Sequence, residues 1–419
     1  MTDRSPKHRK RILVEAYECS PVRAHAPGSA WQILSRLANI YDIWIITEET
    51  VFKDEVEEHF RQNPFLSEHM TFHFLPRRRP EGFDRTRPAI PIREILEYKE
   101  WVKRSYLFAK TLHRKIGFDL AHHLRSDSFR VPGFLWQLPI PFVWGPTGGT
   151  DNIPWEMLDI LGPKGKIRYA IRNIINTMQL KYSPVVRRAV KRTDCLISQT
   201  SKDKENIFKV HGILSILVHE QACNSVSGTC HHYDRGRNLN IAWIGRCVTS
   251  KALPFLLKVI SRPGIRDKVT LHIAGNGPKW ESWKRMANDL NVDSQCIWYG
   301  WLAQKKTSDL LNSCDILAFT SVLEATSATV MESLSLGVPV ICFNRCGFGD
   351  VINNQNGISI RYHNKSQAMD HFSRAIESLI LRPEKLAHLS QGALKAASRY
   401  SWDNLVAKIR DCYESVIVT

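Results

Sequence analysis

The chain has 419 residues, 43% of them apolar, which is typical of a folded globular protein, and its length predicts two domains of roughly 200 residues each. Its 58 Lys and Arg against 41 Asp and Glu give a net charge of +17, but no recognised nucleic-acid motif accompanies that charge, so we expect no nucleic-acid partner. Ten cysteines without a CxxC pair argue against a secreted disulfide framework, and the N-terminus lacks the apolar core of a signal peptide; we therefore expect a cytoplasmic protein.

The first half of the chain alternates short apolar runs with helical patterns. We expect a helix near residues 30–38 and strands at 11–17, 43–49, 118–124, 139–149 and 194–201. The runs at 118–124 and 139–149 each lead into a polar or Gly-rich loop. Alternation of this kind predicts a parallel sheet with right-handed crossovers.

Residues 160–193 form a strongly basic segment. It contains nine Lys or Arg and no acidic residue, namely Lys164, Lys166, Arg168, Arg172, Lys181, Arg187, Arg188, Lys191 and Arg192. Its apolar side chains recur on one helical face, at Ile167, Ile171, Ile174, Ile175 and Met178, so we expect a basic amphipathic helix or helix pair. One interpretation buries this apolar face in the core; the other uses the segment to contact an anionic membrane or an acidic substrate.

A polar stretch at about 223–240 has the composition of a linker between domains. Cysteine and histidine gather in and just before it, at His219, Cys223, Cys230, His231 and His232. Their spacing matches no common zinc site, because zinc ligands usually pair at two to four residues. We expect a linker and no metal site.

Beyond the linker the alternation restarts, with strands expected at 240–246, 271–277, 296–302 and 315–321. The sequence therefore predicts an α/β protein of two Rossmann-like, doubly wound domains that face each other across a cleft. We place the first domain at 1–222, completed by a C-terminal helix at about 401–419, the linker at 223–240 and the second domain at 241–400.

The stretch SVLEATSATVMESLSLGVPV, residues 321–340, leads from a strand through a loop into a helix. Thr326 or Ser327 is the expected N-cap. Glu324 lies in the loop, and Glu332 follows about two helical turns later. The N–H groups at the helix start suit a phosphate, and the carboxylates suit hydroxyl groups, so this stretch predicts a site for a ligand that carries both.

Other residues follow strand ends that parallel topology brings to the same edge. Arg246 and Lys251 could neutralise a diphosphate, although a helix-start Arg and a solvated Lys explain them equally well. Gly275 and Gly277 permit close backbone approach, as does the loop with Gly148 and Gly149 in the first domain. Each Gly-rich loop could also be only a turn.

Several segments together resemble family 4 glycosyltransferases, which have the GT-B fold. In the second half these are GRCVTSKALPFLL, IAGNGP, WYGWL, CDILAFTS and LEATSATVMESLSLGVPVICFNRCGFGDVI. In the first half they are YECSP, FDLAHHL, SFRVPGFLW and PFVWGPTGG, and the terminal YSWDNLVAKIRDCYESV resembles the family's last helix, which crosses back onto the first domain. The pair of glutamates followed by LGVPVI is the most specific part.

The resemblance implies a retaining transferase that uses a nucleotide sugar and needs neither a metal nor another cofactor. Arg246 and Lys251 would then hold the diphosphate, together with backbone N–H groups around Thr326, Ser327 and Ala328. Glu332 would accept hydrogen bonds from the ribose, and Glu324 from the transferred sugar. The acceptor would be lipid-linked or a polysaccharide, met in the cytoplasm or at the inner face of the membrane.

Two departures from the family pattern concern the first domain. The loop that leads to Gly28 has Ala24 and Ala26 at the usual glycine and glutamate positions, which puts its phosphate or acceptor contacts in doubt. The usual place of a catalytic-site histidine is Leu124. His122 and His123 are therefore the candidates, one facing the cleft and the other structural. Asp127 and Asp151 are further candidate polar contacts in the nearby loops.

Two other functions remain open. A nucleotide-sugar epimerase uses the same fold, but epimerases lack this spacing of Glu324 and Glu332. A non-catalytic basic module at a membrane or polymer would keep the fold without turnover, and only the altered loop at 24–26 favours it. Retention of Arg246, Lys251 and both glutamates argues against a scaffold, which needs no leaving-group site.

Overall fold

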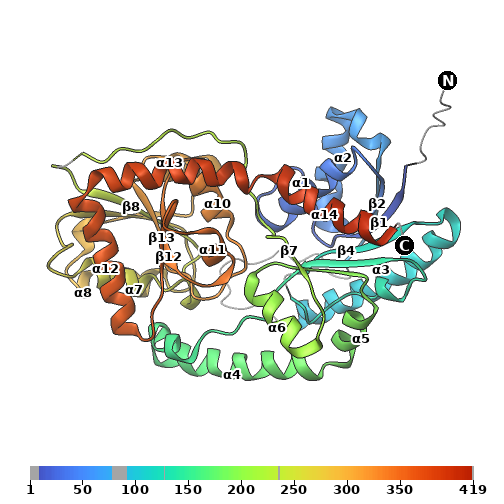
Figure 1. Ribbon diagram of the computed structural model, residues 1–419, viewed down its shortest axis with the longest axis horizontal. Helices are drawn as coiled ribbons and strands as arrows, with labels where there is room; N and C mark the ends of the chain where they lie inside the picture. Colours follow the sequence, from blue (N-terminus) through green and yellow to red (C-terminus); the bar gives the residue numbers. More distant parts are fainter. Residues whose placement is uncertain (1–8, 78–91, 127, 235, 418–419) are drawn as a thin grey trace.

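The computed structural model describes residues 9–77, 92–126, 128–234 and 236–417. Its first half is built on a seven-stranded parallel sheet of order β3-β2-β1-β4-β5-β6-β7 (Figure 1). The strands are β1 (Arg11–Glu15), β2 (Asp42–Glu48), β3 (Met70–Leu75), β4 (Leu120–Ser126), β5 (Phe142–Thr147), β6 (Cys195–Ser198) and β7 (Ile216–Leu217). The helices of this half are α1 (His25–Leu37), α2 (Glu49–Gln62), α3 (Ile92–Ile116), α4 (Gly162–Tyr182), α5 (Pro184–Arg192) and α6 (Ser201–His211).

The second half is built on a six-stranded parallel sheet of order β10-β9-β8-β11-β12-β13. Its strands are β8 (Leu239–Ile244), β9 (Val269–Ala274), β10 (Cys296–Gly300), β11 (Ile316–Phe319), β12 (Val340–Phe343) and β13 (Gly357–Ile360). Its helices are α7 (Leu253–Ile260), α8 (Trp280–Asp289), α9 (Gln304–Asn312), α10 (Ala328–Ser335), α11 (Cys346–Val351) and α12 (Lys365–Leu381). The prediction of two parallel-sheet, Rossmann-like domains is confirmed.

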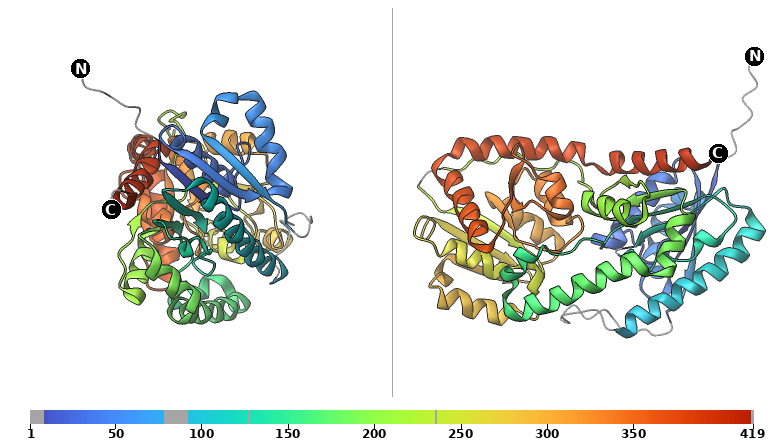
Figure 2. Two further views of the ribbon diagram at one scale, coloured as in Figure 1. Left: turned by 90° about the vertical axis from the view of Figure 1, so that its right-hand side faces the viewer. Right: turned by 60° about the horizontal axis from the view of Figure 1, so that its bottom comes forward.

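Helices α13 (Pro383–Arg399) and α14 (Trp402–Ile417) run along one side of both halves (Figures 1 and 2). Helix α14 returns to the first sheet, where Ile409 and Tyr413 pack in one core with Ile12 and Val14. The two strand residues belong to β1, so the chain's last helix completes the core around its first strand.

A second connection crosses on the opposite side, where α4 lies in Figure 1. The short 3-10 helix η3 (Trp155–Leu161) packs in the core of the second half, with Met157 and Leu158 in the same cluster as Leu253 and Phe372. Residues 153–161 fall within the range expected for the first domain, yet five of their apolar side chains are buried against the second, namely Ile153, Met157, Leu158, Ile160 and Leu161.

Helix α4 is turned the opposite way from a core-facing amphipathic helix. Its apolar residues point outward, with exposed fractions between 49% and 65% at Ile167, Ile171, Ile174, Ile175 and Met178. In the middle of the helix the inward face is polar, because Asn173 is 3% exposed and Asn176 is fully buried, while Leu180 is buried near its end. The interpretation that placed the apolar face in the core is therefore wrong.

The physical reason lies in the loop beneath the helix. The Asn173 side chain donates to the carbonyl of Ile153 (2.6 Å) and accepts from its N–H (3.2 Å), and Asn176 donates to the carbonyl of Thr150 (3.0 Å). Irregular backbone that is buried must find such partners, so the loop selects the polar face. No helix in the described part of the chain is long and apolar enough to cross a membrane.

Candidate functional site

The loops after β8 and β9 pack tightly against each other at the carboxyl edge of the second sheet. Cys247 donates its N–H to the carbonyl of Asn276 (2.9 Å). A Cβ at Gly275, which has φ of +136°, would lie 1.9 Å from the Gly245 carbonyl oxygen, and one at Gly277 would lie 2.9 Å from that of Cys247. Here the two glycines permit loop-to-loop contact, which fixes the backbone on either side of Arg246.

Lys251 and Glu324 meet at the same edge. Lys251 ends the short 3-10 helix η4 (Thr249–Lys251), and its carbonyl accepts from the Thr320 hydroxyl (2.7 Å), while Val322 donates its N–H to Ser250 (2.8 Å). These bonds hold the loop after β8 beside the loop after β11. The Lys251 ammonium and the Glu324 carboxylate form an ion pair there, and both side chains are largely buried.

Helix α10 begins four residues after Glu324. Ser327 occupies the N-cap position with extended backbone, but its side chain makes no capping hydrogen bond. The first N–H groups of an α-helix have no partner within the helix, so this end can receive an anion. The Ala325 carbonyl accepts from the N–H of Gly347 (3.0 Å), which fixes the loop that carries Glu324.

Glu332 lies further along α10 and is directed toward α9. The hydroxyl of Ser308 on α9 donates to its carboxylate. Burial raises the pKa of Glu332, and the Ser308 hydrogen bond opposes that rise. The Glu332 side chain is partly buried in the second turn of α10. Its predicted role toward a ligand stays a prediction.

The two candidate histidines of β4 lie on opposite sides of the first sheet. His122 is fully buried, its Nε2 donates to the Gly145 carbonyl (2.6 Å) and its Nδ1 accepts from the Tyr413 hydroxyl (2.6 Å). Burial lowers the pKa of His122 to about 3. Because both ring nitrogens are used inside the core, His122 links β4 to β5 and α14 and is the structural member of the pair.

His123 forms a buried pair with Glu15, the last residue of β1, through Nδ1 and Oε2 at 2.5 Å. Its Nε2 and the Glu15 Oε1 have no hydrogen-bond partner among the described residues. A Cβ at Gly133 would lie 2.7 Å from both bonded atoms, so the loop after β4 passes directly over the pair. Glu15 was not predicted as a site residue, because its place in an apolar run indicates only a strand.

The first-domain glycines also serve close packing. A Cβ at Gly28 would lie 2.1 Å from the Arg23 carbonyl oxygen, and one at Gly148 would lie 2.1 Å from the Gln199 side-chain oxygen. Gly149 has φ of +81°, in the region that favours glycine. Asp127 lies outside the described residues.

Asp151 pairs with a residue of the other half that sequence reasoning missed. Arg345 follows β12, and its guanidinium donates to the Asp151 carboxylate (2.9 Å) and to the carbonyl of Asn152 (3.3 Å). Both side chains are largely buried. A second bond joins the halves nearby, from the N–H of Ser201 to the carboxylate of Asp350 (2.8 Å). The edges of the two sheets are thus tied together.

Cys223 and His231 of the linker each bind a different backbone carbonyl. The Cys223 thiol donates to the carbonyl of Met331 (3.3 Å), and His231 Nε2 donates to the carbonyl of Leu336 (3.1 Å). Both acceptors belong to the α10 region. Across the described residues, no group of three or more His, Cys, Asp or Glu could hold a metal ion.

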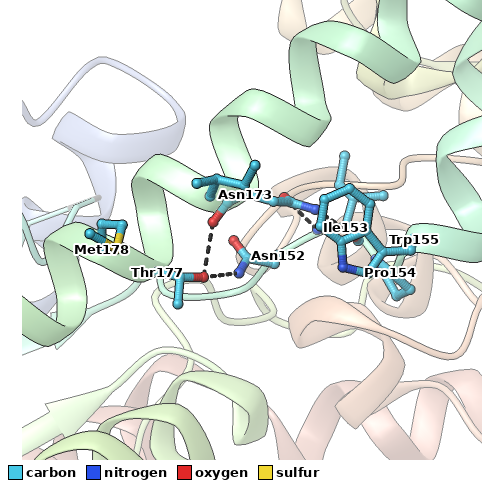
Figure 3. A pocket seen from close by; sticks show the side chains of 8 residues that line it. Asn152, Ile153, Pro154, Trp155, Asn173, Thr177 and Met178 are labelled. Carbon is cyan, nitrogen blue, oxygen red and sulfur yellow. Dashed lines mark hydrogen bonds between the residues drawn. The ribbon is translucent and has the colours of Figure 1, made fainter.

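A cavity of about 310 Å³ lies beside α4, and neither Lys251 nor Glu324 lines it (Figure 3). Polar and apolar side chains line it, from the loop at 152–155 and from one flank of α4: Asn152, Ile153, Pro154, Trp155, Asn173, Ile174, Thr177 and Met178.

Comparisons with known proteins agree with this architecture. Residues 235–396 match the family model of glycosyl transferases group 1. The chain is 25% identical over 190 residues to D-inositol 3-phosphate glycosyltransferase of Rhodococcus erythropolis, an alignment that covers 42% of this chain and 41% of that protein. It is 26% identical over 153 residues to alpha-monoglucosyldiacylglycerol synthase of Streptococcus pneumoniae, covering 36% of this chain and 33% of that one. The chain thus spans less than half the length of these curated relatives.

Solved structures match over nearly the whole chain. The apo form of the lipopolysaccharide outer core galactosyltransferase WaaB superposes with a TM-score of 0.66 at 14% identity, covering 97% of this chain and 99% of that one. HepE of Anabaena, solved in complex with UDP, superposes with a TM-score of 0.61 at 14% identity, covering 97% and 100%. The chain therefore has the GT-B fold, and its second domain is matched by the model of glycosyl transferases group 1.

Proposed function

We propose that the protein is a retaining glycosyltransferase of family 4 that moves a sugar from a nucleoside-diphosphate sugar to an acceptor. The observation that carries this proposal is the meeting of Lys251, Glu324 and the uncapped start of α10 at the carboxyl edge of the second sheet. The match of residues 235–396 to glycosyl transferases group 1 supports it. So does the likeness in fold to HepE, which has been solved with UDP and with UDP-glucose.

The donor's diphosphate is assigned to Arg246, Lys251 and the N–H groups around Thr326, Ser327 and Ala328. Cleavage of the bond between sugar and phosphate leaves negative charge on the nucleoside diphosphate. We assign to these two cations and the helix start the task of stabilising that charge as it develops. The proposal needs no metal and no other cofactor.

Hydroxyl groups of the donor are assigned to the two carboxylates. Glu332 accepts from the ribose, and Glu324 accepts from the transferred sugar once a phosphate draws the Lys251 ammonium toward itself. The acceptor hydroxyl attacks from the face that the diphosphate leaves, and a leaving phosphate oxygen takes its proton, so configuration is retained. His123 is assigned to the acceptor side, with Glu15 holding its ring orientation.

The acceptor is proposed to be lipid-linked or a polysaccharide, in the synthesis of a cell-surface polysaccharide or glycolipid at the cytoplasmic face of the membrane. The names of an aligned relative, a diacylglycerol glycolipid synthase, and of a structural neighbour, a lipopolysaccharide galactosyltransferase, support this class of acceptor.

Calorimetric titration of the full chain with a panel of nucleoside diphosphates and nucleotide sugars tests the donor site. We expect one base to bind best, and Arg246→Ala and Glu332→Ala each to weaken it about 10- to 100-fold, because each removes a hydrogen bond to a charged group. The matched controls are Lys305→Ala and Glu281→Ala, exposed residues of the same domain, which should bind as the parent chain does. Absence of binding to every member by folded protein would favour the non-catalytic binding module.

A further inference from the structure

The outward face of α4 is an apolar surface of a kind that folded proteins seldom leave in water. Ile167, Ile171, Ile174, Ile175 and Met178 follow one another along the helix, and each is about half exposed or more. Trp155, 59% exposed, lines the same cavity as Ile174 and Met178, and Figure 3 shows Trp155 and Met178 at its opposite ends. Contiguous apolar patches of this sort mark contact sites for another protein or for a membrane.

The exposed face is also basic. Lys164, Arg168 and Lys181 are exposed on the same helix, and residues 160–193 contain no acidic side chain. Two copies of the chain that met through this face would bring identical cations together, which opposes association. An apolar strip flanked by Lys and Arg is instead complementary to a lipid surface that carries negative head groups.

We propose that α4 docks the protein on an anionic bilayer. The helix lies in the plane of the interface, with its isoleucines among the acyl chains and its lysines and arginines at the phosphates. At 21 residues and roughly 1.5 Å per residue it supplies an extended contact. The buried Asn173 and Asn176 fix this orientation, because they bind the backbone of the loop beneath the helix.

The cavity beside α4 continues this apolar surface toward the contact between the two domains at Asp151 and Arg345. Apolar side chains of Pro154, Trp155, Ile174 and Met178 form much of its lining, while Asn152 and Thr177 supply polar groups. Asn152 is adjacent to Asp151, which pairs with Arg345. An acyl chain that leaves the bilayer beside α4 would find an apolar wall here and a polar end next to the domain contact.

Vesicle co-sedimentation of the full chain, without nucleotide or acceptor, tests the docking. We expect binding to vesicles that contain phosphatidylglycerol, little binding to phosphatidylcholine alone, and weaker binding as salt is raised. Ile171→Ser with Ile175→Ser should lower the partition coefficient on the order of a hundredfold, because each buried isoleucine contributes about tenfold or more. Lys164→Gln with Lys181→Gln should lower it roughly 25-fold, at about fivefold per cation.

Leu214→Ser with Leu381→Ser is the matched control, since both leucines are highly exposed and neither lies on α4. This variant should bind vesicles as the parent chain does. Equal binding by the isoleucine variant, or no preference for anionic lipid, would overturn the proposal. So would a parent chain that sediments as a dimer which Ile171→Ser with Ile175→Ser dissociates. Because no donor is present, the result is independent of whether the transferase assignment holds.

Discussion

Lys251 and Glu324 lie 73 residues apart in the chain, yet their side chains form an ion pair at the carboxyl edge of the second sheet. Two loops joined by backbone and hydroxyl hydrogen bonds bring them together. In the proposed site this pair is a resting state, in which the cation for the diphosphate and the carboxylate for the sugar neutralise each other.

Substituting the two residues one at a time should therefore affect nucleotide binding and catalytic turnover differently. Lys251→Met is expected to weaken nucleoside diphosphate binding about 10- to 100-fold, through loss of a charged hydrogen bond. Glu324→Gln should leave that binding unchanged or tighter, because Lys251 loses its competing partner, while kcat/KM falls about 10- to 100-fold. Calorimetry and steady-state rates measure the two effects. If Glu324→Gln weakens nucleotide binding as much as Lys251→Met does, the roles are assigned wrongly.

The Arg345–Asp151 pair is expected to stabilise the contact between the two halves. Arg345→Met leaves the Asp151 carboxylate without its partner in a largely buried place, and breaking a buried pair in this way costs about 3–5 kcal/mol. Denaturant unfolding measures the loss. Arg262→Met, which breaks the more exposed pair with Asp370, is the control and should cost less than about 1 kcal/mol. Equal losses would contradict an interdomain role.

The inverted orientation of α4 predicts an unusual pattern of mutational sensitivity. Asn173→Leu should lower the free energy of unfolding by about 2 kcal/mol or more, because the N–H and carbonyl of Ile153 both lose their partner. Ile175→Asn, on the outer face of the same helix, should change it by less than about 0.5 kcal/mol. Thermal or denaturant unfolding of both variants decides the point, and the reverse order of sensitivity would exclude this orientation.

His122 predicts a loss of stability in acid. Burial lowers the pKa of His122 to about 3, whereas an unfolded histidine has a pKa of about 6.5. Between these values the unfolded chain binds a proton that the folded chain does not, so the free energy of unfolding falls as the pH falls. His122→Gln should flatten this dependence, while His388→Gln, at an exposed position, should leave it as it is. Melting temperatures between pH 7 and pH 4 test this, and a parallel slope in the His122 variant would refute it.

Local sequence patterns predicted some residues of the candidate site and not others. The loop and helix around Glu324 and Glu332 were predictable, because strand, loop and helix signals are local and parallel strands bring their ends to one edge. The pairing of Lys251 with Glu324 was not, since it depends on hydrogen bonds between loops distant in sequence. Neither was Arg345, which follows a short strand and meets a carboxylate of the other half.

The sequence by itself determined the two parallel-sheet domains and the strand ends from which the site is built, because the period and length of apolar runs are local properties. Only the tertiary structure decided which faces those elements present. Adjacent residues of a strand point to opposite sides of the sheet, so the sequence alone cannot say which of the two histidines is structural. His122 is the structural one because its ring binds the hydroxyl of Tyr413, which lies 291 residues further along the chain. The backbone at 150–153 likewise decides that the asparagines of α4 turn inward. Its buried N–H and carbonyl groups require hydrogen-bond partners, and leaving them unpaired costs more free energy than leaving the isoleucines exposed.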